Sequence, residues 1–168
     1  RNLTEMAWEV GAVRPGVGVN DGVTLLIRRH MGKDPHWQFD HRLEKPALER
    51  TYGVALYQDQ LCELAMHVGG MSGVEGEQMR RAFTRKNNNR HIEHWREKFI
   101  SGALMNGVSI EVAEKIFGKF HGLYQFPEAH AFAFGVTAYQ MSWLKHYYPL
   151  EFFIGLFNNQ PMGFYNVE

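Results

Sequence analysis

The sequence has a single cysteine, few aspartates and no net charge. Because Cys62 is the only cysteine, the chain cannot form an internal disulfide, and this is typical of proteins in a reducing compartment. Lysine and arginine total 18, as do aspartate and glutamate, so any nucleic-acid site must come from local clustering of cations. The longest apolar stretch, residues 129–144, is interrupted by polar side chains and is shorter than the roughly 20 residues of a membrane span. We therefore expect a buried helix there and no association with a membrane.

Several catalytic patterns are also missing from the sequence. The chain has four aspartates, and no two of them form the Asp-x-Asp pair that two-metal phosphoryl transfer uses. It contains no P-loop, no GxGxxG and no Gly-x-Ser-x-Gly elbow. His91, His94 and Glu97 have helical spacing but lack the partners of a tetrahedral zinc site, so surface histidines are the favoured interpretation. We expect no metal site and no catalytic nucleophile in this sequence.

The apolar residues that are present indicate an all-α fold. They make up 45% of the 168 residues, and no strand-like alternation runs beyond four residues. Helices are predicted over residues 23–31, 44–50, 57–68, 72–86, 91–105, 110–120, 127–147 and 150–157. Residues 14–18 contain a proline and two glycines and are predicted to form turns. Because the chain starts at Arg1 rather than Met, we expect residues 1–168 to be one domain of a longer protein.

Local signals predict where several of these helices begin and end. Ser72 and Glu75 form a capping-box pattern, in which the hydroxyl and the carboxylate each satisfy a backbone N–H group. Ser109 can cap the helix that follows it. Gly32 and Gly107 lie where a helix would end on a left-handed glycine.

Cations cluster at the end of the helix predicted over residues 72–86. Arg80 and Arg81 are followed by Arg85 and Lys86, so the last two turns carry four cations. One interpretation is a solvated helix end, whose cations offset the negative end of the helix dipole. The other is a polyphosphate clamp, because adjacent arginines present two planar forks to phosphate oxygens. From these residues alone, both interpretations stay open.

Further residues extend the anion-binding pattern. Arg14 lies in the predicted turn, and Arg28 and Arg29 end a helix. His130 lies beside the free N–H groups at the start of the longest predicted helix, where an anion could bind. It also shares a helical strip with Lys145, for which core packing is the competing explanation. These residues predict an α-helical module that binds phosphate or nucleic acid.

Sequence motifs also occur in a recognisable order along the chain. They are Arg14-Pro-Gly, Thr51-Tyr-Gly-Val, Tyr57-Gln-Asp-Gln60, Met79-Arg-Arg-Ala82, Glu128-Ala-His-Ala131 and Tyr139-Gln-Met-Ser-Trp-Leu-Lys145. Their order resembles the fingers region of bacterial C-family replicative DNA polymerases, the DNA polymerase III alpha subunit. The likeness covers nearly the whole chain and implies an irregular multi-helix fingers domain. Phe126-Pro-Glu and the ending Asn158-Asn-Gln-Pro-Met-Gly-Phe-Tyr165 are similar to the error-prone branch of that family, used in damage-induced synthesis.

The resemblance implies roles for individual residues. Arg80 and Arg81 match the arginine pair that faces the triphosphate of the incoming nucleotide, and Lys86 matches a basic position after that pair. His130 matches a histidine close to the same pocket, and Arg14 a position near the nascent base pair. The residues expected to contact DNA are Arg28, Arg29, Gln58, Gln60 and Lys145.

The resemblance also implies an activity and partners. The parent protein would be a DNA-directed DNA polymerase, a nucleotidyltransferase of DNA replication or of repair after DNA damage, and this chain alone would be inactive. Mg²⁺ and the catalytic aspartates would belong to a palm domain outside these residues. The implied partners are template-primer DNA, deoxynucleoside triphosphates, the other domains of the polymerase and sliding-clamp or mutasome subunits, in the cytoplasm. The alternatives are a non-catalytic helical DNA-binding module and a structural helical domain whose arginines only decorate its surface.

Overall fold

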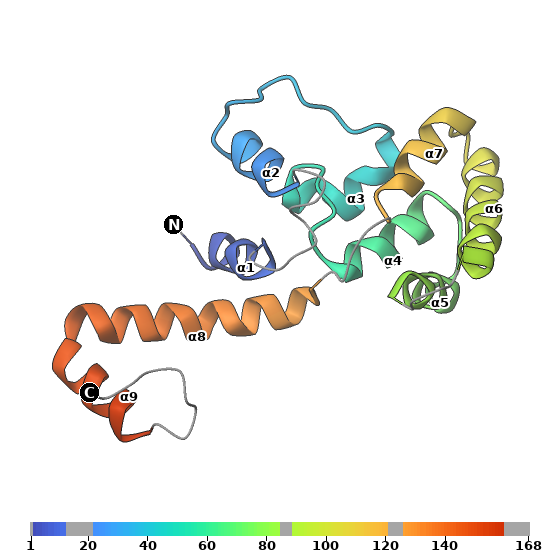
Figure 1. The fold of residues 1–168 in the computed structure, drawn as a ribbon. Helices are drawn as coiled ribbons and strands as arrows, with labels where there is room; N and C mark the ends of the chain where they lie inside the picture. The colour runs from blue at the N-terminus through green and yellow to red at the C-terminus, as the bar shows by residue number, and fades with distance from the viewer. Residues whose placement is uncertain (1, 13–21, 85–88, 121–125, 160–168) are drawn as a thin grey trace. The chain divides into compact units, whose positions relative to one another are not determined.

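The described part of the chain consists of helices joined by loops (Figure 1). The computed structural model describes residues 2–12, 22–84, 89–120 and 126–159. In chain order the elements are α1 (Leu3–Ala12), α2 (Gly22–His30), η2 (Arg42–Glu44), α3 (Lys45–Leu48), η3 (Glu49–Thr51), α4 (Gln58–His67), α5 (Gly73–Thr84), α6 (Asn89–Met105), α7 (Ile110–Gly118), α8 (Glu128–Tyr147) and α9 (Pro149–Asn158). Within these ranges the only β-type pairing is an isolated bridge between Tyr57 and Phe126. The all-α class is confirmed.

The chain divides into two compact units. One contains residues 11–128, and the other contains residues 1–10 together with residues 129–168. The larger unit holds the helices from α2 to α7, and the smaller holds most of α1 and α8 and all of α9.

The core of the larger unit lies where α4, α5, α6 and α7 pack on one another (Figure 1). Its centre is a group of four aromatic rings whose centroids lie 5.4–5.8 Å apart in five pairs: Phe83, Phe99, Phe117 and Phe120. Burying a side chain of this size stabilises the fold by about 1.5–3 kcal/mol. Rings from α5, α6, α7 and the turn after α7 meet here, so this cluster fixes α5, which carries part of the candidate site, against α6 and α7.

Two glycines bring α6 against the chain that leaves α4. A Cβ added to Gly102 would lie 1.8 Å from the carbonyl oxygen of Gly69. A Cβ added to Gly69 would lie 2.6 Å from the ring of Phe99. The backbones touch directly at this point, so a side chain at either position would push them apart.

The predicted helix ends are largely confirmed. Glu75 Oε2 accepts hydrogen bonds from Ser72 N and Ser72 Oγ, both at 2.8 Å, and Glu75 N donates to Ser72 Oγ at 3.3 Å. Ser109 Oγ accepts from Val112 N at 3.4 Å. Gly32 and Gly107 have φ angles of 67° and 79°, in the left-handed region that favours glycine.

Other predicted boundaries differ from the structure. Helix α1 was not predicted, although Asn2 Oδ1 caps it by accepting from Glu5 N at 3.0 Å. The helix predicted over residues 44–50 is a four-residue α-helix, α3, flanked by two 3₁₀ turns. This helical region ends in a turn at residues 51–54, in which Thr51 Oγ1 donates a hydrogen bond to Val54 O at 2.6 Å.

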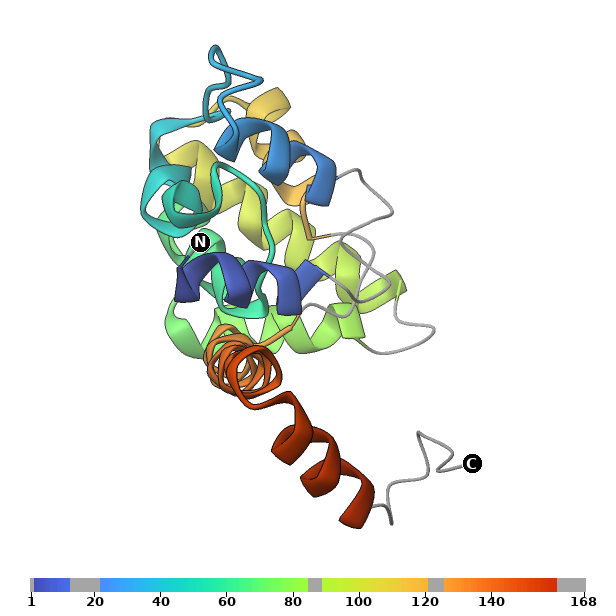
Figure 2. The same ribbon diagram turned by 90° about the vertical axis from the view of Figure 1, so that its left-hand side faces the viewer.

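In the smaller unit, α1 lies against α8. Gly135 of α8 is buried, and a Cβ there would lie 3.4 Å from Ala7 N and 3.5 Å from a methyl group of Leu3. Ala7 is itself fully buried, so two small residues allow this contact. Pro149 begins α9, which leaves the end of α8 in a different direction (Figure 2).

Candidate nucleotide-binding site

The two arginines predicted to bind phosphate share one carboxylate near the end of α5. Glu77 accepts hydrogen bonds from Arg80 Nε at 2.7 Å, from Arg80 Nη2 at 2.8 Å and from Arg81 Nε at 2.7 Å. Glu77 precedes the arginines by three and four residues, the spacing at which helical side chains meet. The sequence interpretation missed Glu77, although this spacing carried the signal.

Arg80 is also bound to a second helix. Its Nη1 donates to Gln58 Oε1 at 3.0 Å, and Gln58 is the first residue of α4. The side chain of Arg80 is 17% exposed, whereas that of Arg81 is 66% exposed. The two adjacent arginines therefore have different environments: Arg80 is held between α4 and α5, and Arg81 faces solvent.

The charges of this cluster are stable at neutral pH. The hydrogen bond from Arg80, opposed by partial burial and aided by the hydrogen bond from Arg81, lowers the pKa of Glu77 to about 2. The hydrogen bond to Glu77 raises the pKa of Arg80 against the smaller effect of burial. Guanidinium groups stay protonated in proteins. Arg80 and Arg81 therefore both carry a positive charge beside the ionised Glu77, and the negative charge of Asp59 also acts on Arg80.

Cys62 lies beside the arginine cluster. Its Sγ is 3.7 Å from Glu77 Oε2. Burial, together with the negative charge of Glu77, raises the pKa of the Cys62 thiol to about 11. Since the thiolate is the reactive form, the raised pKa disfavours Cys62 as a nucleophile at neutral pH.

The second predicted arginine pair also has two environments. Arg29 donates from Nη1 to Tyr52 O at 2.7 Å and from Nε to Asp34 at 3.3 Å, and its guanidinium lies 4.9 Å from the centroid of the Trp37 ring. Tyr52 has a φ angle of 52°, so Arg29 supports a left-handed turn. Arg28, next to it at the end of α2, is exposed. Arg29 thus has structural contacts, and Arg28 presents its charge at the surface.

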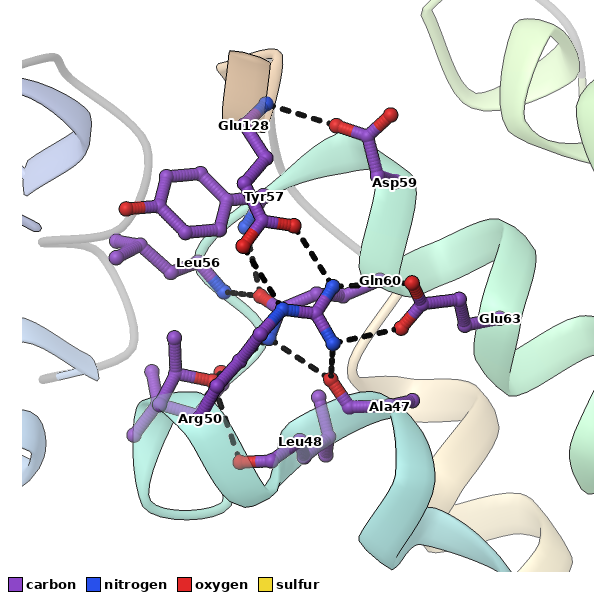
Figure 3. A network of polar contacts seen from close by, with 11 residues as sticks. Ala47, Leu48, Arg50, Leu56, Tyr57, Asp59, Gln60, Glu63 and Glu128 are labelled. Atoms are coloured by element: carbon purple, nitrogen blue, oxygen red, sulfur yellow. Dashed lines mark hydrogen bonds and ion pairs between the residues drawn. The ribbon is translucent and has the colours of Figure 1, made fainter. Parts of the chain in front are cut away.

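Gln60, predicted to contact DNA, is fully buried (Figure 3). Its Oε1 accepts from the backbone N–H groups of Leu56 and Tyr57 at 2.8 and 2.9 Å. Its Nε2 donates to Ala47 O at 3.0 Å and to Thr51 Oγ1 at 2.7 Å. The amide therefore joins α3, the loop before α4 and α4 itself, in the manner of a core residue.

Arg50 forms a partly buried ion network next to Gln60 (Figure 3). It donates to Glu63 from Nη1 at 2.9 Å and Nη2 at 3.0 Å, and to Glu128 from Nε and Nη2, both at 2.8 Å. Burial disfavours the charged guanidinium, but the bonds to Glu128 and Glu63 outweigh it and raise the pKa of Arg50. The sequence analysis did not single out Arg50, because its partners are 13 and 78 residues away.

The start of α8, predicted as an anion pocket, already binds a carboxylate of the chain. Asp59 Oδ2 accepts a hydrogen bond from Glu128 N at 2.8 Å (Figure 3). His130, two residues after Glu128, is exposed, and the centroid of its ring lies 4.4 Å from that of Phe134. A phosphate approaching this helix end would meet Asp59 first, and the sequence alone gave no sign of that contact.

The remaining predicted residues divide between the surface and the undescribed ranges. Lys145 is exposed, with Nζ 5.9 Å from the centroid of Phe153. Arg14 and Lys86 lie outside the described residues. Of the predicted set, the structure brings together Gln58, Arg80 and Arg81.

Neither a candidate metal site nor a candidate membrane span occurs within the described ranges. No group of three or more His, Cys, Asp or Glu side chains there could hold a metal ion. Likewise, none of the described helices is both long and apolar enough to cross a bilayer.

Comparisons with known proteins relate the chain to bacterial polymerases. The profile of the bacterial DNA polymerase III alpha subunit finger domain matches residues 1–107. The error-prone DNA polymerase of Vibrio vulnificus (strain YJ016) is 40% identical over 164 residues, which is 96% of this chain and 16% of that protein. The error-prone DNA polymerase of Idiomarina loihiensis is 39% identical over 172 residues, covering 100% of this chain and 16% of that protein. The chain thus spans about one sixth of these relatives and belongs to the bacterial DNA polymerase III alpha subunit finger-domain family.

Proposed function

We propose that this chain is the fingers part of an error-prone DNA polymerase, in which Arg80 and Arg81 bind the triphosphate of the incoming deoxynucleotide. The observation that carries the proposal is the pair of adjacent guanidinium groups held by Glu77 near the end of α5. Both guanidinium groups are positively charged, and their planar forks suit the geometry of phosphate oxygens. The names of the similar proteins support the error-prone assignment.

The reaction is the attack of a primer 3′-hydroxyl on the α-phosphate of the nucleotide, with pyrophosphate as the leaving group. Enzymes accelerate such phosphoryl transfer mainly by positioning and by neutralising charge. In this proposal the arginine pair holds the β- and γ-phosphates and offsets the charge that develops on pyrophosphate. Mg²⁺, held by a palm domain outside this chain, would supply further neutralisation of the phosphates.

Other residues enter the proposal through the family resemblance. Lys86, Arg14 and His130 are proposed as additional contacts for the nucleotide. Arg28 and Lys145 are proposed to bind template or primer phosphates, and their exposure suits this role. Contacts of this kind strengthen binding in a salt-dependent and sequence-independent way.

Single-nucleotide incorporation by the full parent polymerase tests the proposed nucleotide contact. Arg81→Ala should lower kcat/KM for the nucleotide about 30-fold or more, because the loss of one electrostatic donor at a transition state costs about 2–4 kcal/mol. The affinity for primer-template DNA should stay nearly unchanged. Arg42→Ala is the matched control, because Arg42 is an exposed arginine of the same unit, in η2, with no assigned role.

A different pattern would refute the proposal. If incorporation by Arg81→Ala polymerase survives and only its DNA affinity falls, this face binds duplex DNA and the chain is a non-catalytic DNA-binding module. That outcome would also appear as a smaller dependence of DNA affinity on salt concentration. If neither nucleotide kinetics nor DNA affinity changes, the arginines have no role in binding either ligand.

A further inference from the structure

One carboxylate sets the orientation of both arginines of the pair. Glu77 Oε1 accepts from Arg80 Nη2 at 2.8 Å and from Arg81 Nε at 2.7 Å, and Glu77 Oε2 accepts from Arg80 Nε at 2.7 Å. An arginine side chain has several rotatable bonds, and a charge-assisted hydrogen bond to Nε fixes the plane of its guanidinium group. The two guanidinium planes are therefore coupled through one residue.

The two arginines differ in how far their side chains are exposed to solvent. Arg80 makes a second contact, from Nη1 to Gln58 Oε1 at 3.0 Å, and its side chain is only 17% exposed. Arg81 lies on the solvent side, with 66% of its side chain exposed. Arg80 is thus anchored to α4 through Gln58 and to α5 through Glu77, whereas Arg81 is the member of the pair that a ligand in solution can reach.

We propose that the two arginines have different roles, a division of labour within the pair. Arg81 contacts the nucleotide phosphates directly. Glu77, which is held in place by Arg80, itself bound to Gln58, is the positioning residue that orients Arg81. This inference rests on the proposed function, because it assigns roles within the same nucleotide site. A donor that is already oriented loses less conformational freedom when it binds a ligand. Arg80 contributes by holding Glu77 in place rather than as an equal phosphate ligand.

The negative charge of Glu77 also opposes the binding of phosphate, whereas its hydrogen bonds favour binding. The two effects have opposite signs, so the inference can be tested by removing the charge. A carboxylate behind the arginines weakens their attraction for phosphate, so its removal would tighten nucleotide binding if charge alone mattered. Glu77 is 37% exposed, so solvent screens its action on a ligand beyond the guanidinium groups. Its three direct hydrogen bonds are not screened in this way. Orientation should therefore outweigh charge, and Glu77→Gln should weaken nucleotide binding.

The experiment measures steady-state incorporation of one nucleotide by the full parent polymerase and its variants. Glu77→Gln and Arg80→Ala should each raise KM for the nucleotide about 10-fold, the size expected from losing a charge-assisted hydrogen bond. The double variant should raise KM by clearly less than the product of the two changes, because both act through one contact. Arg81→Ala should have the largest effect, and primer-template affinity should not change in any variant.

Glu75→Gln is the matched control on the same helix. Glu75 binds Ser72 and Lys98 rather than the arginine pair, so its variant should keep the wild-type KM for the nucleotide. Primer-template affinity, measured by fluorescence anisotropy, reports whether each variant keeps its fold. An equal rise in KM for Glu75→Gln would reduce the result to a general perturbation of α5 and overturn the inference.

The other outcomes separate this inference from the proposed function. If Glu77→Gln lowers KM, the carboxylate only competes with phosphate, and the positioning role is wrong. If the effects of Glu77→Gln and Arg80→Ala multiply, the two residues act independently, and the division of labour is wrong. If Arg81→Ala alone raises KM, nucleotide binding by Arg81 stands, whereas the positioning role and the proposed phosphate contact of Arg80 both fail. If Arg81→Ala leaves nucleotide kinetics unchanged, the proposed function itself fails.

Discussion

Gln60 satisfies four buried polar groups where α3, the following loop and α4 meet, so its replacement by leucine has a calculable cost. In Gln60→Leu, Ala47 O keeps its bond from Arg50 Nη1 at 2.8 Å, and Thr51 Oγ1 keeps Val54 O as an acceptor at 2.6 Å. The N–H groups of Leu56 and Tyr57 lose their acceptor. A buried unsatisfied group costs about 1–3 kcal/mol, so the two N–H groups together should cost about 2–6 kcal/mol.

Native-state hydrogen exchange in the full parent polymerase measures this cost locally, where global unfolding of a multidomain protein would not be two-state. A loss of about 2 kcal/mol corresponds to roughly 30-fold faster exchange of the amides in α4. Gln58→Leu is the matched control, because Gln58 is only partly buried and its side chain contacts Arg80. Two results would refute the calculated cost of the two unsatisfied N–H groups. One is amide exchange in Gln60→Leu at the wild-type rate, and the other is an equal acceleration of exchange in Gln58→Leu.

Two further predictions concern backbone packing and thiol chemistry. Gly102→Ala should speed amide exchange in α6, at a cost of about 1–3 kcal/mol, because the new Cβ would lie 1.8 Å from Gly69 O. Gly118→Ala, whose Cβ meets nothing within 4 Å, should not speed exchange in α7, and equal effects would contradict the packing argument. Cys62 should react slowly with iodoacetamide at about pH 8, because raising the pKa from 9.0 to about 11 leaves roughly 100-fold less thiolate than an unshifted thiol has. Mass spectrometry of the Cys62 peptide should show a rate that rises up to about pH 11, and a plateau near pH 9 would be the contrary result.

Local sequence signals predicted much of the helical fold. The bonds between Ser72 and Glu75 begin α5 as expected, and Gly107 follows α6 with a left-handed φ angle. These signals succeed because a cap involves residues within four positions of one another, so the sequence contains both partners side by side. Helix α1 could have been found by the same logic, since Asn2 and Glu5 have capping spacing.

The candidate site was harder to predict than the helices. The pairing of Glu77 with the arginines has i, i+3 and i, i+4 spacing, so it was available from the sequence. The bond from Arg80 to Gln58 crosses between helices, and nothing local indicates it. The same holds for Asp59, which binds the first N–H of α8 from 69 residues away. A pattern of residue types gives the face of a helix but not the partner that the tertiary fold brings to it.

The Arg50 network has a consequence for the lifetime of the folded chain. Its bond to Glu128 closes a segment of 78 residues, within which α4, α5, α6 and α7 all lie. Closing so long a segment costs chain entropy, so we expect the contact to form only after these helices have packed. Interactions absent from the folding transition state mainly slow unfolding. Together with Asp59, which binds Glu128 N, Arg50 would therefore slow the unfolding of the larger unit rather than speed its formation.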